Sequence, residues 1–297
     1  MADLEELVTE SRRAEGDYAA RSTRELVELV NREDATVAAA VAAVAGELAA
    51  AIDAIVERLK AGGRLIYVGA GSSGRIAALD ADESEATFST APGQVVALVA
   101  GAGVASAQER EAAEDDAEAG ARALDELQVS ERDAVVCVSA SGRTPYTVAA
   151  LERAAAAGAL TVALVAAPGT ELAAAADHQL AVVTGPEVVA GSTRLKAGTA
   201  QKLVLNTIST VAMIRLGKTF GDLMVDVRAS NEKLAARARR VVRQATGASE
   251  EEAEAALATA GGSAKVAVVS LVRGIDAEAA RAELERAGGD IGSVLAS

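Results

Sequence analysis

Two short loops rich in glycine and serine carry residue types that can hold an anion. The first, Gly69–Arg75, reads GAGSSGR and follows an apolar run that ends in Tyr67-Val68. The second, Ser139–Pro145, reads SASGRTP and follows the apolar run Val135–Val138. Glycines let backbone N–H groups approach a ligand, and a helix starting behind such a loop adds the positive end of its dipole. Each loop could therefore cradle a phosphate with amides and hydroxyls.

The first loop fits neither of two common nucleotide-binding motifs. Gly69, Gly71 and Gly74 have the dinucleotide spacing, but the next predicted strand ends in residues 101–103 without the acidic residue that binds a ribose. A P-loop is excluded because Arg75 stands where that motif requires lysine. An anion cradle remains, and its candidate phosphate-binding residues are Gly71, Ser72, Ser73, Ser139, Ser141, Gly142, Arg143 and Thr144.

Two sets of carboxylates could move protons. The first is Asp80, Asp82, Glu83 and Glu85, and it begins within about two helical turns of the first loop. The second set has spacings of three and four, which predicts one face of a helix and is typical of a solvated surface. It comprises Glu111, Glu114, Asp115 and Glu118.

Histidine and cysteine chemistry is not expected in this chain. The single histidine, His178, lies in an alanine-rich stretch before a predicted strand, which is typical of a helix end or a surface position. A nucleophilic serine would therefore lack a base. A protein metal site would have to be all-carboxylate, and no such spacing is present, so we predict none.

The elements that position these residues alternate between strand and helix. Continuous apolar runs are typical of strands buried on both faces, and their alternation with helices predicts a parallel α/β sheet. The two loops should converge on one crevice, because the carboxyl ends of parallel strands share an edge. The predicted strands are Arg64–Val68, Val95–Ala100, Ala134–Ser139, Thr161–Ala166 and Leu180–Val183, and the clearest helices between them are Ala105–Leu127 and Pro145–Ala157.

Helical segments flank the predicted sheet. Ser22 and Glu25 form a capping-box signature for a helix over Thr23–Arg32, and an apolar stripe predicts one long helix over Ala35–Lys60. After the sheet we predict Ala197–Leu216, Val225–Thr246, and three short helices near Ser249–Thr259, Ser263–Val272 and Asp276–Ala287. The predicted parts are an N-terminal helical segment (1–60), an α/β domain (61–225) and C-terminal helices (226–297), with a small helical subdomain from about residue 246.

Composition narrows the possible ligands. The chain has 297 residues and a net charge of −14, which disfavours binding to nucleic acid or anionic membranes. Only 2% of residues are aromatic, so a sugar would be held by hydrogen bonds rather than ring stacking. A lone Cys137, an acidic N-terminus without signal-peptide order and the lack of an apolar run of ~20 residues predict a cytosolic protein.

Several longer stretches together resemble one known family. They are Gly62–Asp80 with Glu83, Ser139–Tyr146, and above all Glu187–Leu234, which reads EVVAGSTRLKAGTAQKLVLN, continues to GKTFGDLMVDV and ends in NEKL. The N-terminal LVTES and STRELVELVNRED and the tail ATGASEEEAEAAL with GGDI extend the match over nearly the whole chain. The chain thereby resembles the N-acetylmuramic acid 6-phosphate etherases, which have the sugar isomerase (SIS) fold. Gly191–Asn206 separates this family from generic SIS domains.

The resemblance implies a fold, a reaction and an assembly. The fold would be a three-layer SIS sandwich around a parallel sheet. The reaction would be that of a cytosolic lyase of peptidoglycan recycling and amino sugar catabolism, which splits N-acetylmuramic acid 6-phosphate into N-acetylglucosamine 6-phosphate and D-lactate. No metal or organic cofactor would be needed. The assembly would be a homodimer with the site near the subunit interface.

The resemblance also implies roles for two glutamates. In this family a base removes the C2 proton of the open-chain aldehyde, lactate leaves C3 with acid assistance, and water adds back. Glu83 would be the acid and Glu114 the base. A glutamate side chain with its ordinary pKa of about 4.3 is ionised at neutral pH and is therefore a poor acid. Burial or a second carboxylate would have to raise the pKa of Glu83. Further candidates from the family-specific stretch are Ser192 and Lys196 for substrate binding, and Lys196, Arg194 and Lys202 for the enolate oxygen.

One departure from the family and two other functions stay open. The family tends to have a cysteine and prolines after the first glutamate, whereas this chain has Ser84-Glu85-Ala86, which makes Glu85 a second candidate acid. A sugar-phosphate isomerase on the same fold would also use a carboxylate base at C2. A non-catalytic SIS sensor that binds a sugar phosphate and regulates a partner is the other alternative. The negative charge and the lack of a basic helix-turn-helix segment count against a DNA-linked sensor.

Overall fold

The computed structural model describes residues 8–13, 18–226 and 232–296. Its tertiary contacts divide the chain into two units, the first containing the chain up to Ala81 with Gly93–Ile208, the second Asp82–Pro92 with the chain from Ser209. Two of the three divisions fall within long helices, α4 (Gly71–Phe88) and α9 (Lys196–Arg215), and the third falls between Pro92 and Gly93 in the loop after α4. This partition differs from the boundaries near residues 60 and 225 that we predicted, and those boundaries stay predictions.

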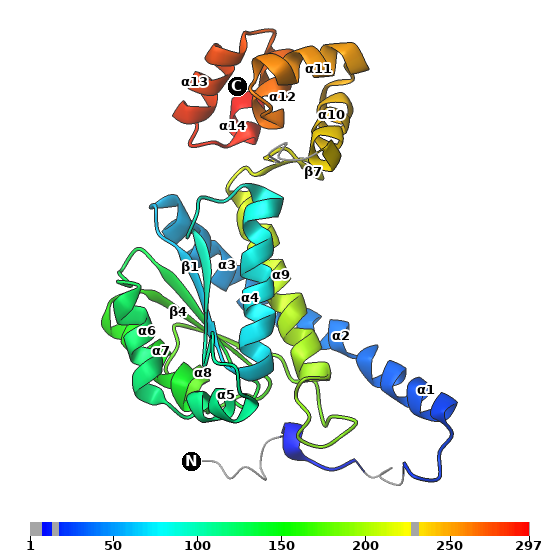
Figure 1. The fold of residues 1–297 in the computed structure, drawn as a ribbon, viewed down its shortest axis with the longest axis vertical. Coiled ribbons are helices and arrows are strands. Elements are labelled where there is room, and N and C mark those ends of the chain that lie inside the picture. The colour runs from blue at the N-terminus through cyan, green and yellow to red at the C-terminus, as the bar shows by residue number, and fades with distance from the viewer. Residues whose placement is uncertain (1–7, 14–17, 227–231, 297) are drawn as a thin grey trace. The chain divides into compact units, whose positions relative to one another are not determined.

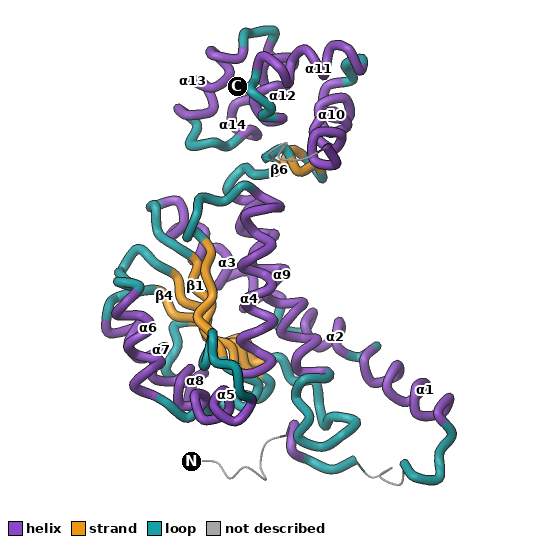
Figure 2. The backbone as a smooth tube through the Cα atoms, viewed as in Figure 1, coloured by secondary structure: helices purple, strands orange, loops and turns teal. Residues whose placement is uncertain are grey.

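A five-stranded parallel sheet forms the centre of the first unit (Figures 1 and 2). All five predicted strands are present, with ends that differ by one or two residues from the prediction. Their spatial order is β2-β1-β3-β4-β5. The strands are β1 (Leu65–Gly69), β2 (Val95–Val99), β3 (Ala134–Val138), β4 (Leu160–Val165) and β5 (His178–Ala181). The parallel α/β architecture is therefore confirmed.

Helices cover both faces of this sheet. Ile66 and Val68 of β1 belong to a buried core that includes residues of α6 (Ala117–Glu126), α7 (Pro145–Ala156) and α8 (Glu171–Ala174). Tyr67 points to the opposite face, where its hydroxyl donates to Asp80 of α4 at 2.8 Å. Another helix, α3 (Ala45–Lys60), contacts β3, β4 and β5. The strands β1, β3 and β4 are buried at every residue, which explains why their sequences are apolar without alternation.

The strand order contains one topological switch point. β1 pairs with β2 on one side and with β3 on the other, so the chain changes direction of winding between β1 and β3. Ligands of open α/β sheets bind at such a switch point, outside the carboxyl ends of the strands. The loops after β1 and β3 are the two glycine-serine loops, and both lie at this point.

The predicted helix Ala35–Lys60 is wrong in one respect, because two helices occupy it. α2 (Val37–Ala42) and α3 are separated at Val44, and the axes of Thr23–Ala42 and Ala45–Lys60 differ by 59°. Gly46 in the first turn of α3 weakens helix continuation. The buried residues of the apolar stripe are Val37 in α2 and, from Leu48 onward, those of α3. The capping box that we predicted is present at the start of α1 (Thr23–Asp34).

Among the described residues no single helix is long and apolar enough to cross a membrane. Only the bent pair Thr23–Ala42 and Ala45–Lys60 together reaches that length and composition.

The predicted helix Ala105–Leu127 is also two helices. α5 (Ala107–Glu114) ends before Asp116, whose side chain accepts the Ala119 N–H at 2.8 Å and starts α6. Aspartate favours such capping positions because it satisfies an amide that the helix leaves unpaired. The expectation that four acidic residues share one helix face is therefore wrong. Glu114 instead lies at the carboxyl end of α5.

The second unit is mainly helical. Its core contains buried residues from α10 (Glu232–Thr246), α11 (Glu250–Thr259), α12 (Ala264–Arg273), α13 (Ala277–Arg286) and α14 (Ile291–Ala296). The three predicted short helices correspond to α11, α12 and α13. A hairpin of β6 (Thr219–Phe220) and β7 (Leu223–Met224) was not predicted. Of the predicted helix Val225–Thr246, the N-terminal part 227–231 lies outside the described residues.

Two glycines allow the close crossing between β1 and α4. A Cβ on Gly74 would lie 2.7 Å from the carbonyl oxygen of Gly69 and 2.7 Å from Cγ1 of Val99. A Cβ on Gly69 would lie 2.9 Å from Gly74 Cα. No side chain fits at either position without a shift, so the approach of the first turn of α4 to the sheet edge depends on both glycines.

We expect the substitution Gly74→Ala to lower the free energy of unfolding by about 1–3 kcal/mol, because overpacking forces α4 away from β1. Urea unfolding followed by circular dichroism measures the change. Gly46→Ala is the control, since a Cβ there meets nothing within 4 Å. It should leave stability unchanged or raise it by up to about 1 kcal/mol. Equal destabilisation by the two substitutions would contradict this account of Gly74.

Candidate active site

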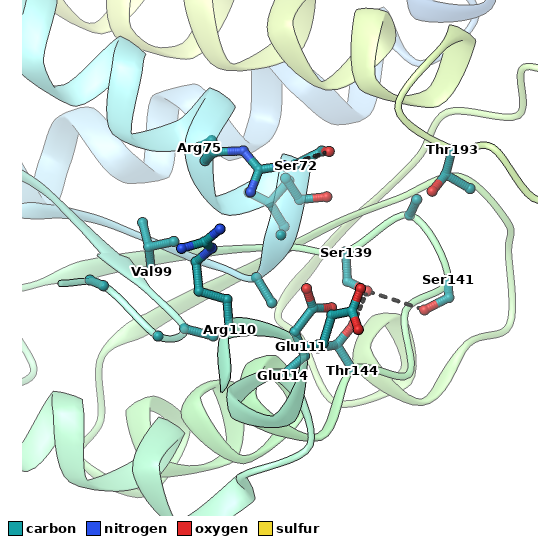
Figure 3. A pocket seen from close by; sticks show the side chains of 18 of the residues that line it. Ser72, Arg75, Val99, Arg110, Glu111, Glu114, Ser139, Ser141, Thr144 and Thr193 are labelled. Atoms are coloured by element: carbon teal, nitrogen blue, oxygen red, sulfur yellow. Dashed lines mark hydrogen bonds between the residues drawn. The ribbon is translucent and has the colours of Figure 1, made fainter. Parts of the chain in front are cut away.

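A cavity of about 950 Å³ lies at the carboxyl-end edge of the sheet in the first unit. The ends of β1, β2 and β3, the first turn of α4, and α5 supply most of its walls (Figure 3). The two glycine-serine loops thus converge on one crevice, as the strand pattern predicts. The predicted site residues that line it are Gly71, Ser72, Ser73, Glu114, Ser139, Ser141 and Thr144.

The loop after β3 forms a connected group of hydroxyls. Ser139 Oγ lies 3.0 Å from Thr144 Oγ1 and 3.4 Å from Ser141 Oγ, and it accepts the Gly142 N–H at 3.1 Å. Gly142 has φ +64°, and a Cβ there would lie 2.2 Å from Thr170 Oγ1. Only glycine therefore fits, and it shapes the loop without lining the cavity. The Thr144 hydroxyl lies within hydrogen-bond distance of Ser139 Oγ and makes no side-chain cap for α7.

The loop after β1 is shorter than we predicted. α4 begins at Gly71 rather than near Ile76, so Ser72 and Ser73 belong to its first turn. Gly71 has φ +53°, and a Cβ on it would lie 2.7 Å from Glu114 Oε1. The carboxylate of Glu114 therefore lies against the amino end of α4, where side chains and ligands with negative charge are favoured.

The surroundings of Glu114 make it a stronger base than a solvated glutamate. Burial raises the pKa of Glu114, and the negative charges of Asp115 and Glu111 raise it further, while the positive charge of Arg75 partly offsets them. A carboxylate with a raised pKa accepts a proton more readily near neutral pH.

Arginines in the cavity were missed as ligand-binding candidates. Arg110 was not singled out in the sequence, and Arg75 was noted only as a mismatch to the P-loop. Arg110 lies four residues before Glu114, which puts both on one face of α5, and this spacing was the available signal. Figure 3 shows the Arg75 and Arg110 side chains pointing toward one another. Glu10, Glu111 and Thr193 also line the cavity, and of these only Glu111 was noted, as part of the acidic helix face.

Lys196 and Ser192 do not line the cavity, and neither does Arg143. Lys196 is 2% exposed, and its Nζ donates to Glu33 Oε2 at 2.9 Å and to the Thr184 carbonyl at 2.7 Å. Its backbone N–H donates to buried Glu187 at 3.0 Å. The hydrogen bonds of Lys196 thus fix the start of α9, and its ammonium group is bound to protein atoms outside the cavity. The other predicted enolate donors, Arg194 and Lys202, are exposed and also lie outside the cavity lining.

Glu83 lies far along α4 from the cavity. It follows Gly71 by 12 residues on the same helix (83 − 71), which at a rise of 1.5 Å per residue corresponds to about 18 Å along the axis. Glu83 is exposed and does not line the cavity, and the same holds for Asp82 and Glu85. Buried Asp80 accepts the Tyr67 hydroxyl and the Asn206 amide, which is a structural role. Glu83 belongs to the second unit and Glu114 to the first, and of the two only Glu114 lines the cavity.

Neither His178 nor Cys137 lines the cavity. His178 starts β5 rather than ending a helix, opposite Val162 of β4. Cys137 is buried in β3, and burial raises the pKa of its thiol. Buried thiols of this kind are unreactive.

Comparison with family models and solved structures identifies the fold class. The glucokinase regulatory protein N-terminal SIS domain matches residues 47–155, and the SIS domain matches residues 116–210. A phosphoheptose isomerase from Francisella tularensis superimposes with a TM-score of 0.54 at 19% identity, covering 65% of this chain and 100% of that chain. Another, from Neisseria gonorrhoeae, has a TM-score of 0.51 at 18% identity, covering 64% and 98%. Fold and cavity thus define a protein of the SIS class.

Curated relatives narrow this class to one family. An N-acetylmuramic acid 6-phosphate etherase of Rubrobacter xylanophilus is 60% identical over 95% of this chain and 94% of its own. Relatives with the same name from Streptomyces avermitilis (53% identity, 100% and 96% covered) and Aliivibrio fischeri (46%, 99% and 98%) match as completely. The chain belongs to the N-acetylmuramic acid 6-phosphate etherase family.

We expect Asp115→Asn to lower the pKa of Glu114, because the substitution removes a negative charge that raises it. Titration of the Glu114 carboxyl by nuclear magnetic resonance measures the shift directly. Glu109→Gln on the same helix is the control, since Glu109 is not among the charges that act on Glu114, and it should change nothing. An unchanged or higher pKa of Glu114 in Asp115→Asn would contradict the electrostatic account.

Proposed function

We propose that this chain is a carbon–oxygen lyase that cleaves the D-lactyl ether of N-acetylmuramic acid 6-phosphate, giving N-acetylglucosamine 6-phosphate and D-lactate. The observation that carries the proposal is Glu114, a partly buried carboxylate with a raised pKa, placed between two hydroxyl-rich loops in one cavity. The relatives that cover nearly the whole chain carry the name of this activity.

The hydroxyl groups and helix starts of the cavity support binding of the substrate phosphate. Ser139, Ser141 and Thr144 lie before the start of α7, while Ser72 and Ser73 lie in the first turn of α4. Helix starts and hydroxyls hold phosphate without requiring a net positive surface. An acidic protein can therefore bind an anionic sugar locally.

Glu114 would act as the base of the elimination. In the open-chain sugar the C1 aldehyde acidifies the C2 proton, and Glu114 removes it to give an enolate. The electron pair then forms the C2–C3 double bond as the C3–oxygen bond breaks, and an acid protonates the departing lactate oxygen. Water adds to C3 of the unsaturated aldehyde, and a proton returns to C2. General acid and base steps of this kind each contribute about 10²–10⁴-fold.

The acid has two candidates, distinguished by where they lie. We propose Glu83 of a second copy in a homodimer, because about 18 Å of α4 separates Glu83 from the cavity of its own chain. Leu79, one turn before Glu83 on α4, is 56% exposed and offers an apolar contact for that second copy. Glu111 is the alternative, because it lines the cavity beside Glu114 on α5.

The proposed function includes a cytoplasmic location, which the family resemblance implies.

We expect Glu114→Gln to reduce D-lactate release from N-acetylmuramic acid 6-phosphate by about 10²-fold or more while the sugar phosphate still binds. An enzymatic D-lactate assay measures turnover, and calorimetry measures binding. Glu109→Gln is the matched control and should keep full activity. An isomerase or a sensor would bind a sugar phosphate but release no lactate. Failure of the unmodified protein to release any would refute the proposed reaction.

We expect mixed dimers of Glu83→Gln and Glu114→Gln chains to recover activity that neither variant has alone. If Glu83 serves the partner's cavity, each mixed dimer contains one intact site, and random mixing restores roughly a quarter of normal turnover. The two variants are unfolded, refolded together and assayed for D-lactate. A different set of results would assign the acid to Glu111 instead. In that case Glu83→Gln keeps full activity, Glu111→Gln loses activity, and mixing the chains gives no recovery.

A further inference from the structure

Two arginine side chains in the cavity are not explained by the proton transfers. Arg75 of α4 and Arg110 of α5 both line it and point toward one another (Figure 3). In the part of the chain that the structure describes, neither forms an ion pair with a carboxylate. Two guanidinium groups that face each other repel, and an anion between them would remove that repulsion.

The hydrogen bonds of both arginines hold them in place and leave donors for a ligand. Arg110 Nη1 donates to the carbonyls of Val104 and Ala105 at 2.9 and 2.7 Å. Arg75 Nη2 donates to Ser72 Oγ at 3.1 Å. A guanidinium has five N–H donors in a planar fork, so the donors of Nε and Nη2 of Arg110 and those of Nε and Nη1 of Arg75 remain.

The chain is built so that Arg110 can approach the end of β2. Gly101 has φ +66°, and a Cβ there would lie 3.1 Å from Arg110 Cα and 3.3 Å from Arg110 Cγ. A larger residue at this position would push α5 outward. The glycine therefore helps to place the guanidinium over the cavity.

The substrate of the proposed reaction carries two anionic groups, and the cavity offers two kinds of anion donor. The three hydroxyls of Ser139, Ser141 and Thr144, which lie before the start of α7, suit a phosphate. The arginine pair suits a planar carboxylate, which a guanidinium can bind through two parallel hydrogen bonds. N-Acetylmuramic acid 6-phosphate has its phosphate on C6 and its carboxylate on the lactyl group at C3.

We propose that Arg75 and Arg110 bind the carboxylate of the lactyl group and so select substrates that carry it; this inference rests on the proposed function. A sugar phosphate without that ether, such as the product N-acetylglucosamine 6-phosphate, does not engage the pair. The arginines then hold the leaving group while the C3–oxygen bond breaks.

The experiment compares the two sugar phosphates in a Glu114→Gln background, where the bound substrate is not consumed. Calorimetry gives the dissociation constants of both sugars for Arg75→Gln and Arg110→Gln. The matched control is Arg122→Gln, which removes the same charge from α6, where Arg122 forms ion pairs with Asp116 and Glu118. Circular dichroism checks folding. Because Arg110 also holds a loop, Arg75→Gln supplies the independent second variant.

We expect each cavity variant to bind N-acetylmuramic acid 6-phosphate about 10-fold to 100-fold more weakly, as for loss of a charge-assisted hydrogen bond. Binding of N-acetylglucosamine 6-phosphate should change by less than about twofold, and Arg122→Gln should change neither. Equal weakening of both sugars would mean that the arginines hold the phosphate, and unchanged binding of both would mean that they hold no anion; either result overturns the inference. If the Glu114→Gln protein without further substitution binds only N-acetylglucosamine 6-phosphate, the proposed function fails first.

Discussion

Glu114 Oε1 lies so close to Gly71 that a methyl group on that glycine would be 2.7 Å from it, and several features of the chain meet in this contact. Gly69 and Gly74 allow α4 to start close against the edge of the sheet. The break at Asp116 ends α5 at Glu114 instead of carrying the helix past the cavity. Gly101 lets α5 approach the end of β2. If any of these positions held a bulkier or more helix-favouring residue, the carboxylate would move away from the start of α4.

The lining of the cavity around Glu114 explains how a protein of negative net charge can bind an anionic ligand. The chain has a net charge of −14, yet the cavity presents hydroxyls, helix starts and two arginines on the walls around one raised-pKa glutamate. Coulombic forces from surface carboxylates are screened by solvent within about 10 Å, whereas hydrogen bonds inside the cavity act directly on the ligand. A strongly negative overall charge therefore disfavours extended polyanions as partners and still permits a small sugar phosphate in the cavity.

Much of this architecture could be predicted from the sequence, for identifiable reasons. The five strands are continuous apolar runs, and the two loops follow β1 and β3, so their convergence depends only on parallel topology. The helix breaks at Val44 and Asp116 were missed, because a long apolar or acidic stripe has the same period whether or not the helix is interrupted. Arg110 was missed because its spacing of four residues from Glu114 indicates only a shared helix face, and the position of that face over the cavity depends on β2 and Gly101. The role proposed for Glu83 requires a second copy of the chain, which no pattern within one chain can show.

The stretch Gly191–Asn206, which we identified as family-specific, supplies Thr193 to the cavity lining and packs against the N-terminal segment. A Cβ on Gly191 would lie 2.6 Å from Glu10 Oε2, and the Gly191 N–H donates to the Thr9 carbonyl at 2.9 Å, so the N-terminal segment packs on this loop. Burial alone would raise the pKa of Glu33, yet hydrogen bonds from Lys196 and Arg13 hold it below its usual value. Glu10 and Thr193, which line the cavity, are positioned by this network. A sequence signature can thus identify a family through residues that only hold others in place, because a buried charge that loses its partner is more costly than an exposed one.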